Sequence, residues 1–191
     1  RFWQNMPKEE KFLKQELKNA YEKVSTGTEL RAGLIEMKNL LKEEKNRREL
    51  AYQLGGDFKI LTHCLSDEDP KVRKNAALVL GAMESADLVP VLLHAYKKED
   101  TLFVKSAYLK ALFDLDYEEE LPYLKERLQE LDETPVTEEN QKHLREEAGM
   151  LQQLISQKEK HKKHTFDGFD RQVEVILLTN REQREATRNQ L

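Results

Sequence analysis

Two histidines three residues apart, His161 and His164, come closest in their spacing to a site for chemistry. Side chains three residues apart on a helix share a face, so the two imidazoles could bind one metal ion. A protein metal site needs further ligands, and none is evident in the sequence beside them. The pair lies in the basic run QKEKHKKH. We therefore interpret both as solvated histidines and predict no metal site.

The other reactive residue types also lack the spacing of a catalytic or cofactor site. The glycines form no Gly-x-Gly-x-x-Gly pattern and no phosphate-binding loop. No serine, cysteine or lysine has a general base at motif spacing. The single cysteine, Cys64, excludes an internal disulfide and falls on an apolar helical stripe, which favours a small core residue over a reactive thiol. We predict no catalytic residue and no cofactor.

The composition is that of a mostly helical protein. The 191 residues include 7 Gly and 5 Pro, and 36% are charged, so helix breakers are scarce. The net charge of −4 does not favour nucleic-acid binding by the chain as a whole. We expect a reducing, cytoplasmic setting and no membrane span. The start without Met is consistent with a longer chain, and Phe2 and Trp3 are expected to cap the first helices or, alternatively, to bind a ligand.

An internal repeat explains most of the apolar pattern. The stretch FKILTHCLSDEDPKV starts at Phe58, and a matching stretch, VPVLLHAYKKEDTLF, starts 31 residues later at Val89. Pro90 is followed by a matching Pro122 at a spacing of 32 residues. Two nearly equal spacings in succession indicate repeated units, which bury their apolar faces by stacking on one another.

Each unit is predicted to consist of two helices. Asp69 can cap the second helix of its unit, with Pro70 at the first helical position. An earlier helix is expected to end at Gly55-Gly56. Apolar residues at helical spacing define a core between the helices, and small alanines in the second helices allow close helix contacts. The predicted core contains Leu61, Leu65, Val72, Ala76, Leu80, Leu92, Tyr96 and Ala107, and Phe103 and Ala111 share the face of Ala107.

The segment DPKVRKNAALVLGAM resembles the second helix of a HEAT-like repeat. It carries an Asp-Pro start, a Val-Arg pair, and two alanines before Leu-Gly. The resemblance to the armadillo/HEAT superfamily covers about residues 50–131 and is closest to units of two short helices. It implies an all-α fold, a right-handed α-solenoid of stacked helix pairs. We expect this helical-repeat domain to cover residues 1–157.

The character of the sequence changes after residue 157. Residues 158–172 are predicted to form a basic linker. Residues 173–191 contain one strand, Val173–Leu178, and a helix, which we interpret as the start of a second domain. This strand would dock on the solenoid, pair with a second copy of the chain, or stay mobile. The segment HTFDGFDRQVEVILLTNREQREATRNQL is similar to the opening segment of bacterial RNA methylases, although their Asn-Pro-Pro-aromatic signature is absent.

A strip of basic residues is the candidate binding face. Lys74 and Lys105 are 31 residues apart and are predicted to occupy equivalent, exposed positions on two second helices. Arg47, Arg48, Lys71 and Lys110 would widen this strip. The second helices of α-solenoids line the inner surface, where partners usually bind. The alternative is an ordinary solvated face with acids nearby.

The function predicted from these patterns is that of a non-catalytic scaffold that binds a macromolecule, most readily a protein. RNA is a second candidate partner. The alternative function is the recognition arm of an RNA methyltransferase whose S-adenosylmethionine-binding domain would lie beyond Leu191. A third interpretation, an accessory repeat of a bilin lyase, rests on the repeat length alone.

Overall fold

The computed structural model describes residues 8–115 and 121–157. Within these ranges all regular structure is helical, which confirms the all-α prediction for this part of the chain. Several predictions fall outside the described residues: the linker 158–172, the strand Val173–Leu178 with its helix, His161 and His164, and the role of Phe2 and Trp3. The handedness of the stack stays a prediction.

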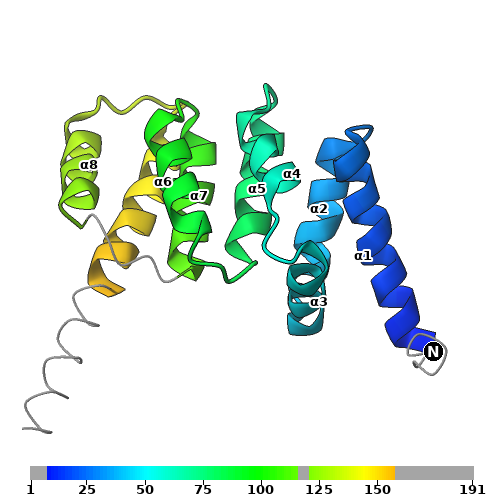
Figure 1. Ribbon diagram of the computed structural model, residues 1–191. Helices are drawn as coiled ribbons and strands as arrows, with labels where there is room; N and C mark the ends of the chain where they lie inside the picture. The colour runs from blue at the N-terminus through cyan, green and yellow to red at the C-terminus, as the bar shows by residue number, and fades with distance from the viewer. Residues whose placement is uncertain (1–7, 116–120, 158–191) are drawn as a thin grey trace, which may run out of the picture.

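The helices lie in a row, with α1 at one end and α8 at the other (Figure 1). α5 packs against both α2 and α7, and α6 packs against α7. A last described helix, residues 141–157, contacts α6 and α8 through its side chains. The elements are α1 (Lys8–Thr26), α2 (Leu30–Leu40), α3 (Glu44–Leu54), α4 (Lys59–His63), η2 (Cys64–Ser66), α5 (Pro70–Gly81), α6 (Leu88–Lys98), α7 (Leu102–Asp114) and α8 (Leu121–Glu133).

Local signals define the helix ends as predicted at two places. The carboxylate of Asp69 accepts a hydrogen bond of 2.8 Å from the backbone N–H of Lys71, and Pro70 is the first residue of α5. This N-cap satisfies one backbone donor that has no partner inside the helix. α3 ends at Leu54, and its C-cap Gly55 has a φ of 55°, in the left-handed region that glycine tolerates best.

The core runs continuously from α1 to the helix 141–157. The eight residues from Leu61 to Ala107 that were predicted as core between the helices are all buried. Leu61, Ala76, Leu80, Leu92 and Tyr96 have no exposed surface at all. Each helix pair thus buries its apolar face against its neighbours, as expected for stacked repeats. Among the described residues, no helix is both long and apolar enough to cross a membrane.

α5 and α7 approach each other closely because small residues meet at their contact. A Cβ atom placed on Gly81 would lie 2.7 Å from the Cα and 2.8 Å from the Cβ of Ala111. A similar approach of α1 and α2 occurs at Gly33, where a Cβ would lie 2.9 Å from the backbone oxygen of Ala20. The prediction that small residues bring the second helices together is therefore confirmed at Ala111.

The true register of the repeat differs by one residue from the one predicted for the second helices. α5 begins at Pro70 and α7 begins at Leu102, so equivalent positions lie 32 residues apart. One residue rotates a helix position by about 100°. Phe103, predicted in the buried face, is therefore only half-buried, while Val104 and Tyr108 are buried.

Candidate binding groove

A groove with a volume of about 850 Å³ runs across α2, α5, α7 and the helix 141–157. We name it the basic groove, because seven of the described residues that line it are basic and only Glu146 is acidic. The 32-residue spacing of the repeat explains how α5 and α7 form the groove together. The residue pairs 71 and 103, 74 and 106, 75 and 107, and 78 and 110 are each 32 apart, and all eight residues line the groove. The basic residues are Arg31, Lys38, Lys71, Lys74, Lys110, Lys142 and Arg145.

The cations of the groove lie close enough to affect one another. Burial lowers the pKa of Lys38 below its ordinary value, and the charges of Lys74, Lys42 and Lys110 lower it further. The ammonium of Lys38 donates a hydrogen bond of 3.3 Å to the side-chain oxygen of Asn75, a neutral partner. Positive charge exceeds negative charge in the described lining, where only Glu146 is acidic and pairs with Lys142 at 3.9 Å. The groove is therefore an attractive site for an anionic partner.

Four large apolar residues line the groove, and we call them its floor. Ile35, Leu78, Phe103 and Met150 line it and are half-buried. The ring of Phe103 is tilted against the ring of His143, with 5.8 Å between the ring centroids. The ammonium of Lys74 lies 5.9 Å from the centroid of the Phe103 ring. The groove therefore offers apolar contact between its charged walls.

The six residues of the predicted binding face fall into three groups: three line the basic groove, two lie elsewhere on the protein, and Lys105 is buried. Lys71, Lys74 and Lys110 line the basic groove. Arg47 and Arg48 do not line it. The guanidinium of Arg47 donates to the backbone oxygens of Leu41 and Lys42, at 3.0 Å each, and so holds the turn before α3. The side chain of Arg48 is 79% exposed and pairs with Glu44 one helical turn away.

The prediction that Lys105 shares the exposed surface of Lys74 is wrong. Lys105 is only 7% exposed, and its ammonium donates a 3.0 Å hydrogen bond to the backbone oxygen of Tyr96. The ammonium also lies 4.4 Å from the centroid of the Tyr96 ring, a cation–π contact. The cause is the register: Lys105 is equivalent to Arg73, and Ser106 is the true counterpart of Lys74.

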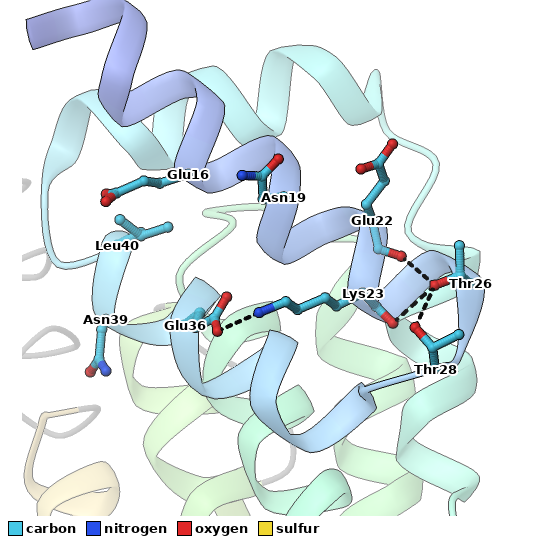
Figure 2. Close-up of a pocket in the computed structure, with 9 residues that line it drawn as sticks. All are labelled: Glu16, Asn19, Glu22, Lys23, Thr26, Thr28, Glu36, Asn39 and Leu40. Carbon is cyan, nitrogen blue, oxygen red and sulfur yellow. Dashed lines mark hydrogen bonds and ion pairs between the residues drawn. The ribbon is translucent and has the colours of Figure 1, made fainter.

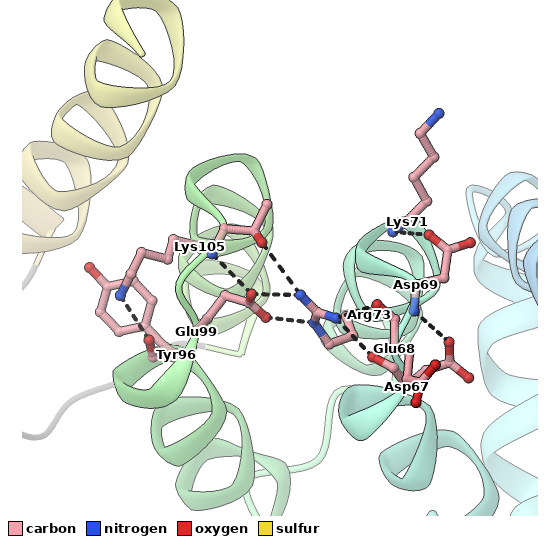
Figure 3. Close-up of polar contacts among 9 residues, drawn as sticks. Asp67, Glu68, Asp69, Lys71, Arg73, Tyr96, Glu99 and Lys105 are labelled. Carbon is pink, nitrogen blue, oxygen red and sulfur yellow. Dashed lines mark hydrogen bonds and ion pairs between the residues drawn. The ribbon is translucent and has the colours of Figure 1, made fainter. Parts of the chain in front are cut away.

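Arg73 connects one repeat to the next (Figure 3). Its guanidinium donates hydrogen bonds of 2.8 and 2.9 Å to the two carboxylate oxygens of Glu99, in the turn after α6. It also donates to the backbone oxygen of Asp67, at 2.8 Å, in the turn before α5. Burial of Glu99 would raise the pKa of its carboxylate, but the guanidinium of Arg73 and the backbone N–H of Thr101 outweigh burial and lower that pKa. This network fixes the spacing of two units and contributes no free reactive group.

A second buried network holds the end of the described stack. Glu147 has no exposed surface and accepts hydrogen bonds from the hydroxyl of Tyr96, at 2.7 Å, and from the Nε of Arg127, at 2.9 Å. Burial raises the pKa of Tyr96, and the charge of Glu147 raises it further. The sequence carried a signal for this network, since Glu147 lies inside an apolar stripe, three residues after Leu144 and four before Leu151.

A hollow between α1 and α2 has a volume of about 740 Å³ and an acidic character (Figure 2). Glu16, Glu22 and Glu36 line it. Its one basic side chain among the described residues, Lys23, pairs with Glu36 at 2.7 Å. Within residues 8–115 and 121–157, no cluster of His, Cys, Asp and Glu could hold a metal ion. Cys64 is buried, and burial raises the pKa of its thiol, so it is a core residue.

Sequence reasoning missed half of the groove. Arg31, Lys38, Lys142 and Arg145 were not among the candidates, although a signal for each pair was present. Arg31 and Lys38 are seven residues apart, which is two helical turns, and Lys142 and Arg145 are three apart, so each pair shares a helix face. What the sequence did not show is that α2 and the helix 141–157 flank the second helices.

The stacked helix pairs define the protein as a helical-repeat protein. Residues 58–142 match the family model described as HEAT repeats, which supports the predicted resemblance to HEAT-like repeats. No curated protein and no solved structure matches the chain. The predicted similarity of the C-terminal segment to RNA methylases has no support in these comparisons.

Proposed function

We propose that the protein is a non-catalytic scaffold that binds a macromolecular partner in the basic groove. The observation that carries this proposal is the convergence of seven basic side chains, with one carboxylate, from four neighbouring helices. HEAT repeats commonly serve as protein-interaction scaffolds and are typically not enzymes. A groove that spans several repeats binds through a broad surface, which suits a macromolecule better than a small substrate.

The groove also differs from an active site. Most of its polar side chains are lysines and arginines. Ser106 is the one hydroxyl-bearing residue among the described lining, and its hydroxyl donates to the backbone oxygen of Leu102, at 3.5 Å, and not to a general base. The alternative function, the recognition arm of an S-adenosylmethionine-dependent RNA methyltransferase, depends on the segment from residue 164 onward. That segment lies outside the described residues. The groove supports the scaffold function without it.

Affinity capture with matched variants tests the proposed function. The groove variant is Lys74→Glu with Lys110→Glu, and the control is Arg48→Glu with Lys59→Glu, two exposed positions outside the groove. Both double variants change the net charge equally, so a bulk charge effect would appear in both. Each tagged protein is incubated with cell extract, and the captured proteins are quantified by mass spectrometry.

We expect a set of proteins that the wild type and the control capture and that the groove variant loses. The same capture spectrum from all three proteins would contradict the proposal. Exposed charges contribute little to folding, so the variants should unfold at nearly the same temperature as the wild type.

A further inference from the structure

We infer that the partner of the basic groove is an acidic protein segment, bound in extended form, with apolar side chains between its carboxylates. This inference rests on the proposed function and names the class of partner for the same groove. Three features of the groove carry it: the sign of its charge, the spacing of its cations, and its apolar floor.

The charge of the groove selects an anionic partner although the chain is acidic overall. The net charge is −4, yet the described lining holds seven basic residues against one acid. Lys38, Lys74 and Lys110 come from three helices that pack one against the next, α2, α5 and α7. Burial lowers the pKa of Lys38, and the positive charges of Lys74 and Lys110 lower it further, so these ammonium groups repel one another. Carboxylates between these ammonium groups would relieve this repulsion. A basic or neutral segment would leave it in place.

The spacing of the cations fits an extended chain that crosses the helices. α2 packs against α5, and α5 packs against α7, so each helix adds cations at the next step along the groove. Packed helices lie about 8–10 Å apart. An extended peptide in the polyproline II conformation advances about 3.1 Å per residue and has three residues per turn. Carboxylates at every third residue therefore share one face of the peptide and advance by nearly one helix spacing. Such a segment can place successive carboxylates near Lys38, Lys74 and Lys110 in turn.

The floor favours a peptide over a nucleic acid. Ile35, Leu78 and Met150 offer half-buried apolar surface between the cations, and apolar side chains of a peptide can cover it. Proteins that bind single-stranded nucleic acids combine a basic groove for the phosphate backbone with open aromatic faces on which the bases stack. The one aromatic ring of the floor, Phe103, is already in contact with the His143 ring and the Lys74 ammonium. The groove therefore lacks an open stacking platform.

Binding of defined probes to the purified chain tests the inference. The first probe is a fluorescent ten-residue peptide with Glu at every third position and Leu among the other residues. The second replaces each Glu by Gln, the third replaces each Leu by Ser, and the fourth is a fluorescent ten-nucleotide single-stranded RNA. Fluorescence anisotropy is measured with the wild type, with the groove variant Lys74→Glu/Lys110→Glu, and with the control Arg48→Glu/Lys59→Glu.

We expect the Glu/Leu peptide to bind the wild type and the control alike, and to bind the groove variant at least tenfold more weakly. The Gln and Ser peptides should each bind at least tenfold more weakly than the Glu/Leu peptide, and affinity should fall as salt is raised. RNA binding tighter than peptide binding would overturn the inference in favour of a nucleic-acid partner. Equal binding of the Glu and Gln peptides, or of the wild type and the groove variant, would also overturn it. If these probes fail while partner capture still depends on the groove, only the acidic-segment inference falls.

Discussion

The guanidinium of Arg73 and the carboxylate of Glu99 form two parallel hydrogen bonds, of 2.8 and 2.9 Å, across the boundary between two repeats. Arg73 lies in α5, and Glu99 lies in the turn that leads from α6 to α7. The side chain of Glu99 is 5% exposed and that of Arg73 is 18% exposed. A two-point contact of this kind fixes orientation as well as distance, so the pair sets how α7 sits beside α5, and both helices line the basic groove.

Replacement of Arg73 by Ala is predicted to destabilise the protein by about 3 kcal/mol, because Glu99 would remain as a buried carboxylate without its counter-ion. Urea unfolding measures this change. The matched control is Arg48→Ala, which removes an exposed ion pair and should cost less than about 0.5 kcal/mol. In the double variant Arg73→Ala/Glu99→Gln the cost should be smaller than the sum of the single costs. Additive costs would show that the pair does not couple the repeats.

The same pair predicts a stability change in acid. The pKa of Glu99 is lowered from its ordinary value of 4.5 in the folded state. The stabilisation by its charged form is therefore fully present above about pH 4.5 and is lost as the pH falls through the lowered pKa. The wild type should be more stable than Glu99→Gln by a constant margin from pH 7 down to about pH 5. This margin should shrink at lower pH in urea unfolding experiments, and a margin that grows in acid would contradict the assignment.

Two lysines that the sequence pattern placed at equivalent positions should behave differently. Lys105→Glu puts a negative charge at a buried site, beside the backbone oxygen of Tyr96, and is predicted to cost about 3 kcal/mol or to prevent folding. Lys74→Glu changes a groove position that is half exposed, and it should cost less than about 1 kcal/mol. Thermal unfolding of the two variants compares them directly. Equal stability of the two variants would contradict the 32-residue register and support the predicted equivalence of Lys74 and Lys105.

Two glycines offer a matched test of helix packing. Gly81→Ala would force a Cβ to within 2.8 Å of the Ala111 Cα and Cβ, so α5 and α7 must move apart at a cost of about 1–3 kcal/mol. A Cβ atom placed on Gly149, in the helix 141–157, would meet no atom of a neighbouring described helix within 4 Å. Gly149→Ala should therefore stabilise the protein by about 0.5–1 kcal/mol. Destabilisation by Gly149→Ala and none by Gly81→Ala, measured by urea unfolding, would contradict the described contact.

Local sequence signals predicted the helices well, but they did not predict contacts between residues far apart in the chain. Asp69 and Pro70 marked the start of α5, and the apolar periodicity marked the core, because both depend on residues within a few turns of one helix. The binding face was only half predicted. A one-residue change in register turns a side chain by about 100°, which is why Lys105 was placed on the surface. The partners of Glu147 lie 20 and 51 residues away in the chain, and no local pattern connects such distant residues.

The most direct test of the central claim is a map of where an acidic segment binds. Backbone amide signals of the isotope-labelled protein are followed by nuclear magnetic resonance while the Glu/Leu peptide is added. Binding in the basic groove predicts that the largest shifts fall on residues 31–38, 71–78, 103–110 and 142–153. Shifts centred on the α1–α2 hollow around Glu22, or on Arg47 and Arg48, would show that the basic groove is not the binding site.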